Sequence, residues 1–218
     1  SPVDSDDDKY DELYQNLQNG DTLLKQEEFI DMGNVDDISQ GEYFGGAVWA
    51  LIKSFKSPFK TLMKMGILEE YMFGDTKFNL LCHQVKDKYF NDVPYLDIDP
   101  YLVMFERVQQ FFKETKDEES VDALRHAFYL KVGTQIEPDE LGKGSKIWRK
   151  NTLINMLKEW GWDAKKLERL NDYSNWQMMH KVDLGNRINK ILMASYKNIS
   201  EKNKTLDPSE SLITEKDT

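Results

Sequence analysis

The sequence predicts an all-α protein. Apolar residues recur every three or four positions through most of its 218 residues, which is the spacing of one helix face. No segment shows sustained alternation of β-branched and polar residues, as a half-buried strand would. Prolines and glycines separate the periodic segments and indicate where helices begin and end. We therefore expect roughly eight to ten helices joined by short loops.

The first helices are predicted from their boundary residues. The stretch from Leu13 to Phe29 is expected to be helical, with a break at Gly20-Asp21. The glycines between Gly41 and Gly46 follow no strand, so we interpret them as the start of a helix rather than as a phosphate-binding loop. Ser57-Pro58 predicts the next start, because serine can cap a helix and proline fits the first turn. The apolar face of this helix comprises Phe59, Leu62, Met63 and Ile67, before a break at Gly74-Asp75-Thr76.

Three further helices follow in the middle of the chain. The first is predicted by an apolar stripe at helical spacing, and the second by the pairing of Asp99 with Pro100, which again combines a cap with a first-turn proline. Ser120 is the predicted cap of the third. Their apolar positions are Phe78, Leu81, Cys82, Val85 and Tyr89; then Tyr101, Phe105, Val108 and Phe112; then Val121, Leu124, Ala127 and Phe128.

The last part of the chain contains shorter helices and one long helix. Glu137-Pro138 opens a short turn that ends near Gly142 or Gly144. A helix that stops at Gly161 and one short helix follow, and a long helix with a weak point at Gly185 ends the series. The apolar positions are Leu153, Met156, Leu157 and Trp160; then Ala164, Leu167 and Leu170; then Val182, Ile188, Ile191, Leu192 and Tyr196.

These stripes predict two groups of buried residues. The first should form one small bundle and comprises Trp49, Leu62, Ile67, Phe78, Leu81, Val85 and Tyr89. The second comprises Tyr101, Phe105, Val108 and Phe112, packed against the following helix. If Trp49 is fully buried, its replacement by alanine should cost about 3–5 kcal/mol.

Composition and charge exclude several classes of protein. An aromatic content of 12% is too high for a chain that is disordered throughout. The longest apolar run, Phe44 to Ile52, is too short to span a bilayer, which needs roughly 20 residues. The single cysteine excludes an internal disulfide and a Cys-rich zinc site. The net charge of −10, without a dense run of lysine or arginine, disfavours nucleic-acid binding.

The two ends of the chain are expected to be disordered. Residues 1–12 contain six acidic residues and one lysine, and we expect a flexible acidic lead-in. From Ser200 the chain has no aromatic residue and contains Asp207-Pro208-Ser209, so residues 200–218 are expected to form a disordered tail. The chain lacks an initiator Met, so we expect it to begin downstream of the natural N-terminus.

The sequence contains no arrangement of residues that specifies catalysis, a cofactor or a metal site. The three histidines, His83, His126 and His180, are far apart and lack ligand spacing. Cys82 lies on an apolar stripe, so we expect it to be buried, and His83 lies about 100° away around the helix from the sulfur.

Other candidate groups have simpler structural interpretations. The adjacent carboxylates Glu69/Glu70 and Glu118/Glu119 point apart on a helix and are interpreted as solvated faces. Four tryptophans could line a ligand box, but packing in the core is the favoured interpretation because buried aromatic rings dominate small helical cores. They are Trp148, Trp160, Trp162 and Trp176. No catalytic or binding residue is therefore assigned.

One pattern runs through residues 49–89: Trp49, Ser57-Pro58 at a helix start, Met65-Gly66-Ile67 at its end, and Tyr89 in the last helix. This pattern resembles a WY-domain unit, which occurs in the RXLR effectors that oomycete plant pathogens secrete. Thr76 stands where a proline is frequent, and neither an RXLR tetrapeptide nor a Glu-Glu-Arg follow-on is present. A second, more degenerate unit would have Phe128 in the tryptophan position and Glu137-Pro138 in place of Ser-Pro. Tyr173 and Tyr196 are alternatives for its tyrosine.

The resemblance implies small helical bundles of WY type in two tandem units. Residues 13–115 would hold the first unit, with the WY-like part at 49–89, and a linker helix, and residues 116–199 would hold the second unit. The implied function is that of a non-enzymatic effector, secreted into host plant cells, which binds host proteins and suppresses immunity. Two alternatives remain open: a hydrolase or transferase that uses the Cys82 region or a Trp-lined pocket, and a structural helical protein.

Overall fold

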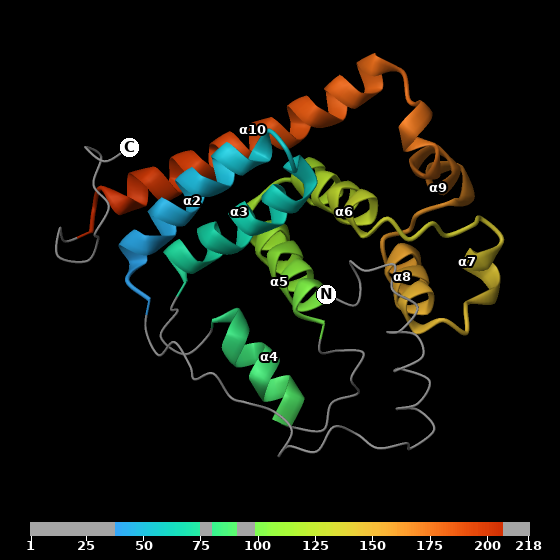
Figure 1. Cartoon of the computed structure of the whole chain (residues 1–218), viewed down its shortest axis with the longest axis horizontal. Coiled ribbons are helices and arrows are strands. Elements are labelled where there is room, and N and C mark those ends of the chain that lie inside the picture. The colour runs from blue at the N-terminus through green and yellow to red at the C-terminus, as the bar shows by residue number, and fades with distance from the viewer. Residues whose placement is uncertain (1–37, 75–79, 91–98, 207–218) are drawn as a thin grey trace. The chain divides into compact units, whose positions relative to one another are not determined.

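The computed structural model describes residues 38–74, 80–90 and 99–206, and every regular element in these ranges is helical (Figure 1). The predicted all-α class is therefore confirmed. The helices are α2 (Gln40–Ser54), α3 (Pro58–Phe73), α4 (Leu81–Phe90), α5 (Pro100–Thr115), α6 (Glu118–Val132), α7 (Glu140–Lys143), α8 (Trp148–Glu159), α9 (Ala164–Asn171) and α10 (Met178–Asn203), with a 3-10 turn η4 (Tyr173–Asn175). The helix predicted between Leu13 and Phe29 lies outside the described residues.

Two of the three helix starts lie where they were predicted, and the predicted capping hydrogen bond forms at one of them. Asp99 caps α5, because its carboxylate accepts a hydrogen bond from the Tyr101 N–H at 2.8 Å, and Pro100 occupies the first turn. Ser57 is at the N-cap position of α3, although its hydroxyl makes no capping hydrogen bond. The Ser120 cap was predicted wrongly: Asp117 accepts from the Ser120 N–H at 2.8 Å and from its hydroxyl at 2.7 Å. These bonds lower the pKa of Asp117, with the hydroxyl contributing most.

Gly161 and Gly185 differ in whether they interrupt a helix. Gly161 follows α8 with a φ of 68°, a left-handed conformation that glycine adopts without strain, and the predicted stop is confirmed. Gly185 does not interrupt α10, which runs through it to Asn203. The helix thus continues past residue 200, where the tail was expected to start. Residues 1–12 and 207–218 lie outside the described part of the chain.

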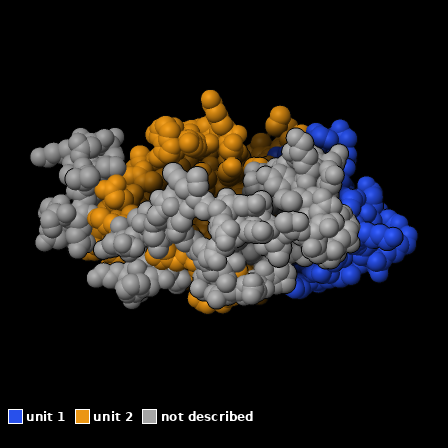
Figure 2. Space-filling view, turned by 60° about the horizontal axis from the view of Figure 1, so that its bottom comes forward, with its two compact units in different colours: residues 1–34, 132–176 blue, residues 35–131, 177–218 orange. Residues whose placement is uncertain are grey.

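The chain divides into two compact units, which Figure 2 shows in blue and orange. One unit includes residues 132–176, with α7, α8, α9 and η4, and the other includes residues 35–131 and 177–218, with α2 to α6 and α10. The expected segments 13–115 and 116–199 follow the order of the sequence, whereas the second of these units is discontinuous. As a statement about independently folding domains, the tandem division stays a prediction.

In the unit that comprises residues 35–131 and 177–218, α2, α3 and α10 pack against one another, and α5 packs on α3 (Figure 1). The second predicted stripe is confirmed: Tyr101, Phe105, Val108 and Phe112 are all buried. Phe105 stacks on Phe128 of α6 with ring centroids 4.0 Å apart. The stripe therefore packs on the following helix, as expected.

The first predicted bundle is only partly correct. Leu62 and Ile67 are buried, but Leu81 and Val85 are only half-buried. Trp49 is 58% exposed, so its predicted burial is wrong, and so is the large cost of Trp49→Ala that depended on it. Phe78 and the side chain of Tyr89 lie outside the described residues. No helix in the described ranges is long and apolar enough to cross a membrane.

Candidate functional site

The strongest candidate for a functional site is a groove between α2 and α3, with a volume of about 600 Å³. We call it the lysine groove. It is lined by four lysines, Lys53, Lys56, Lys60 and Lys64, together with Gly46, Trp49, Ala50, Ile52, Ser57, Thr61 and Leu68. Its size falls within the range of small-molecule sites.

Local sequence explains how the groove forms. At Gly46, a Cβ atom would lie 3.2 Å from Cδ2 of Leu68, so the absence of a side chain lets α2 approach α3 closely. Lys53 is in the last turn of α2 and Lys56 in the turn that follows it, whereas Lys60 and Lys64 are four residues apart on α3. Residues four apart share one side of a helix. The short turn before Pro58 therefore brings two lysine pairs to one place.

The groove concentrates positive charge in a chain whose net charge is −10. None of the described residues that line the groove carries a carboxylate. The pKa of Lys64 is lowered, first by burial and then by repulsion from Lys60 and Lys53. An anion in the groove would relieve this repulsion.

Exposed apolar side chains lie on the same two helices and the turn between them. Trp49, Ile52 and Phe55 are 58%, 55% and 91% exposed. Lys53 Nζ lies 4.9 Å from the centroid of the Trp49 ring, a cation–π contact that holds the ammonium beside the groove. The site can therefore offer an anionic ligand both charge and an aromatic wall.

The adjacent carboxylates Glu69 and Glu70 were expected to be solvated faces, and this expectation is wrong. Glu69 is 2% exposed, with its Oε2 atom 2.7 Å from Lys116 Nζ. Its Oε1 atom accepts hydrogen bonds from Lys116 at 2.9 Å and from Asn198 Nδ2 at 2.7 Å. Glu69 thus links α3 to the end of α5 and to α10, which is a structural role. Glu118 and Glu119 are exposed, as expected.

A second hollow, of about 780 Å³, is bordered by residues of α3, α4 and α5. Its main charged feature is a two-point pair in which Arg107 Nε donates to Glu70 Oε2 at 3.0 Å and Nη2 donates to Oε1 at 2.8 Å. The other charged residues on its border are of both signs, namely Lys88, Glu106 and Glu114. This mixture gives the hollow no preference for a charged ligand, so it ranks below the lysine groove.

The predicted sites in the Cys82 region and among the tryptophans do not assemble. Cys82 is exposed, so its predicted burial is wrong. The aromatic rings form separate pairs: Trp160 packs on Trp162, and Trp176 on Tyr173, each with centroids 5.1 Å apart. Trp162 is buried, in agreement with core packing, and the side chain of Trp148 lies outside the described residues. Within the described ranges, no three His, Cys, Asp or Glu side chains are placed to hold a metal ion.

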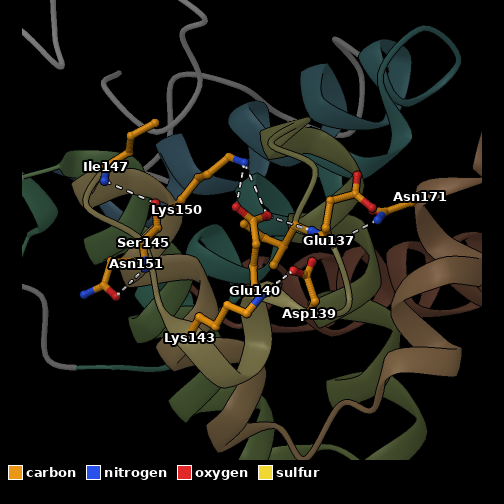
Figure 3. A network of polar contacts seen from close by, with 10 residues as sticks. Glu137, Asp139, Glu140, Lys143, Ser145, Ile147, Lys150, Asn151 and Asn171 are labelled. Atoms are coloured by element: carbon orange, nitrogen blue, oxygen red, sulfur yellow. Dashed lines mark hydrogen bonds and ion pairs between the residues drawn. The ribbon is translucent and has the colours of Figure 1, made fainter.

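A polar network in the smaller unit holds its loops together (Figure 3). Glu140 Oε2 accepts from the Glu137 N–H at 2.8 Å, and Lys150 Nζ donates to Glu140 Oε1 at 3.1 Å. Asn171 Nδ2 donates to the Ile136 carbonyl at 2.9 Å. The Glu137 N–H is the main cause that lowers the pKa of Glu140, and Lys150 adds to it. Each of these groups is used in joining α7, α8 and α9 to their loops, so we assign the network a structural role.

The lysine groove was missed at the level of sequence because its charges are not contiguous. A search for a dense basic run passes over four lysines spread across twelve positions, on two helices and the turn between them. The signal that could have found it is the repeated spacing of three or four residues on both sides of Ser57-Pro58. Together with Trp49 and Ile52, that spacing indicates a basic surface with apolar side chains beside it.

Comparison with known proteins identifies relatives for most of the chain. Residues 38–217 match the family model described as adenylate cyclase, class-I, second domain. The chain is 32% identical over 178 residues to the adenylate cyclases of Salmonella typhimurium and Escherichia coli K12, which covers 81% of this chain and 21% of each relative. The Proteus mirabilis adenylate cyclase is 29% identical over 191 residues, covering 87% of the chain and 22% of that protein. No solved structure matches the chain.

These matches overturn the resemblance to oomycete RXLR effectors. The family model covers the whole WY-like segment 49–89, the expected first unit from residue 38 onward and all of the second, and the relatives are enterobacterial adenylate cyclases. The exposure of Trp49 gives the physical reason, because the WY pattern requires that ring in the core. The expected non-enzymatic immune suppressor, its secretion into host cells and its oomycete source are therefore wrong, and the expected plant partners were implied only by that resemblance. The chain spans about a fifth of the length of the curated relatives it matches, and it belongs to the class-I adenylate cyclase family.

Proposed function

We propose that this chain acts in the synthesis of cyclic AMP, as the second-domain portion of an adenylate cyclase. The observation that carries the proposal is the family match, which extends from residue 38, before α2, to residue 217, beyond α10. A match of that length includes every described helix. It is supported by identity of 32% to adenylate cyclases from two genera.

The proposed reaction is an intramolecular displacement in ATP. The ribose 3′-oxygen attacks the α-phosphorus, and the bond from that phosphorus to the oxygen that bridges it to the β-phosphorus breaks. Pyrophosphate leaves with the bridging oxygen, and the proton of the 3′-hydroxyl is released to water. Negative charge builds on phosphate oxygens, so cationic side chains near them lower the barrier. The reaction class is that of a lyase, which differs from the hydrolase or transferase considered from sequence.

The test is the formation of cyclic AMP in cells. The whole polypeptide to which residues 38–217 belong would be expressed in an Escherichia coli strain that lacks its own adenylate cyclase. Intracellular cyclic AMP would then be measured. We expect cyclic AMP well above that of the empty-vector strain. A variant with Phe105→Asp, which places a charge in the core of the helical unit, should lose both soluble protein and cyclic AMP.

A conservative control separates folding from function. Phe111→Leu changes a half-buried ring at the edge of the same helix and should leave cyclic AMP formation intact. The proposal would be overturned if the polypeptide were soluble and folded, at the same expression level as an active Escherichia coli adenylate cyclase, and cyclic AMP did not rise above background.

A further inference from the structure

The surface around the turn between α2 and α3 carries positive charge in an acidic chain. Between Glu42 and Glu69 the sequence has four lysines and no acidic residue, although the net charge of the chain is −10. Three of these lysines, Lys53, Lys56 and Lys64, are exposed. The positive charge is therefore local, and it faces solvent, where a partner can reach it.

The same surface presents three large apolar side chains to solvent, namely Trp49, Ile52 and Phe55. They follow one another at intervals of three residues, and the backbone of Phe55 keeps helical dihedral angles after the last residue of α2. Successive members therefore lie about 60° apart around the helix and share one side of it. Phe55 is 91% exposed, so its ring projects from the protein. Exposed apolar groups that gather in this way mark a surface that binds a protein or a membrane.

The projecting ring and the flanking lysines favour a lipid surface over a protein partner. A second copy of this chain would bring lysines against lysines, which disfavours association through this surface. An acidic protein would satisfy the charge, but it would have to enclose Phe55 in a pocket of its own, since this chain surrounds so little of the ring. A bilayer needs no matching pocket, because its mobile acyl chains adapt to an inserted side chain.

We propose that the surface formed by the end of α2, the turn after it and the start of α3 docks on an anionic lipid bilayer. Phe55 and Trp49 enter the boundary between headgroups and acyl chains, and the exposed lysines contact the anionic headgroups. Lys53 Nζ lies 4.9 Å from the centroid of the Trp49 ring, so an ammonium group and an indole, both suited to the membrane–water interface, are adjacent. This attachment is peripheral and goes beyond the proposed function.

The net charge of −10 does not prevent docking in this orientation. At physiological salt, charges more than about 8 Å from the bilayer are largely screened, so the lysines nearest to it dominate. Each lysine close to an anionic leaflet strengthens binding by about fivefold. Binding should therefore depend on a few side chains of one surface, which makes it open to test by substitution.

The experiment measures co-sedimentation of the full 218-residue chain with sucrose-loaded lipid vesicles. One set of vesicles contains equal parts of phosphatidylglycerol and phosphatidylcholine, and the other contains phosphatidylcholine alone. We expect the partition coefficient to be at least tenfold higher for the anionic vesicles, and to fall as salt is raised, because the charges that attract the chain to the bilayer are screened.

Two variants test the two parts of the surface. Lys56→Gln with Lys64→Gln removes two exposed charges and should weaken partition onto anionic vesicles at least tenfold, at about fivefold for each lysine. Phe55→Ser removes the projecting ring and should weaken it at least fivefold, because the apolar area that enters the bilayer is lost. All three side chains are exposed, so both variants should keep the melting transition of the parent chain.

Matched controls change the same kinds of side chain elsewhere. Met179→Ser removes an apolar side chain that is 70% exposed at the start of α10, and Lys158→Gln with Lys165→Gln removes two exposed charges from the other unit. Each control should alter the partition coefficient by less than twofold. Losses as large as those of the surface variants would show that any exposed apolar or basic group suffices, and the inference would be wrong.

Three further outcomes would also overturn the inference. The first is the absence of co-sedimentation at millimolar lipid and low salt. The second is equal partition by the parent chain and either surface variant. The third is binding of a glutamate-rich peptide that contains one tryptophan, weakened by Lys56→Gln with Lys64→Gln, in a chain that does not bind vesicles; this result would identify an acidic protein as the partner. None of these measurements involves cyclic AMP, so failure here leaves the proposed function standing, and the reverse also holds.

Discussion

Glu69 is a buried carboxylate whose charge is compensated by Lys116 and by the amide of Asn198. Lys116 also lies 5.2 Å from the ring of Phe112, so its ammonium group has few ways to regain water. The side chains of Glu69 and Lys116 are 3% and 11% exposed. Removing one member of such a pair leaves the other without compensation, which costs more than the pair itself contributes.

We therefore predict that Glu69→Gln lowers the free energy of unfolding by about 3 kcal/mol. Combining it with Lys116→Met should recover part of that loss, because no unpaired charge then remains. The measurement is urea denaturation followed by circular dichroism. Asp139→Asn is the matched control, since its pair with Lys143 is solvent-exposed, and its urea midpoint should not move. Equal effects of Glu69→Gln and Asp139→Asn would contradict the argument.

The same residues show how far sequence can lead at this scale. Tyr101, Phe105, Val108 and Phe112 repeat at helical spacing, and their burial was predictable because one face of one helix decides it. The burial of Glu69 depends on Lys116 and Asn198, which are 47 and 129 residues away. Only the packing of three helices places these partners together, so a pair of adjacent glutamates in the sequence was interpreted as solvated.

The approach of α3 to α5 depends on Gly66. A Cβ atom at this position would overlap Cγ1 of Val108 and lie 3.1 Å from Cε1 of Phe112, both of which are fully buried. Neither neighbour can move without displacing the core around it. The helices are therefore as close as the missing side chain allows, and this closeness is a property of the two elements together.

We predict that Gly66→Ala destabilises the chain by about 1–3 kcal/mol, the range of overpacked cores. Gly185→Ala is the matched control in α10, where no atom of the described residues, the helix's own backbone apart, lies within 4 Å of the added Cβ. There alanine should stabilise by about 0.5–1 kcal/mol, because it lowers the entropy of the unfolded chain and favours helix. Thermal melts of both variants provide the measurement. Stabilisation by Gly66→Ala would show that the α3–α5 contact is looser than described.

Helix starts and stops were predictable where a single side chain determines them. Asp99 with Pro100 and the glycine at 161 act on their own backbone neighbours, and each boundary lies where it was expected. The lysine groove was not predictable in this way, because it needs the ends of α2 and α3 to meet. The spacing of its lysines is visible in the sequence, but which residues face them is decided by the approach of α2 to α3 at Gly46.

At the scale of the molecule, α10 completes a unit whose first described helix, α2, begins 138 residues earlier. It packs on α2 and α3, and Asn198 reaches Glu69 of α3. The sequence could not indicate this return, because periodicity describes each helix but not its partner. The tandem division at residue 116 followed sequence order for the same reason.

The last prediction concerns truncation at either side of α10. Ending the chain at Leu206 retains the whole helix and should leave the melting transition unchanged. Ending it at Trp176 removes the buried side chains of α10, which include Leu184, Ile188, Ile191, Leu192 and Ile199. Each buried aliphatic side chain contributes about 1.5–3 kcal/mol, so together they approach or exceed the total stability of about 5–15 kcal/mol that is usual for a domain. The shorter chain should therefore lose cooperative unfolding of α2 to α6, as measured by circular dichroism melts and by hydrogen exchange. Retention of protected amides in α2 and α3 would show that these helices form a stable core without α10.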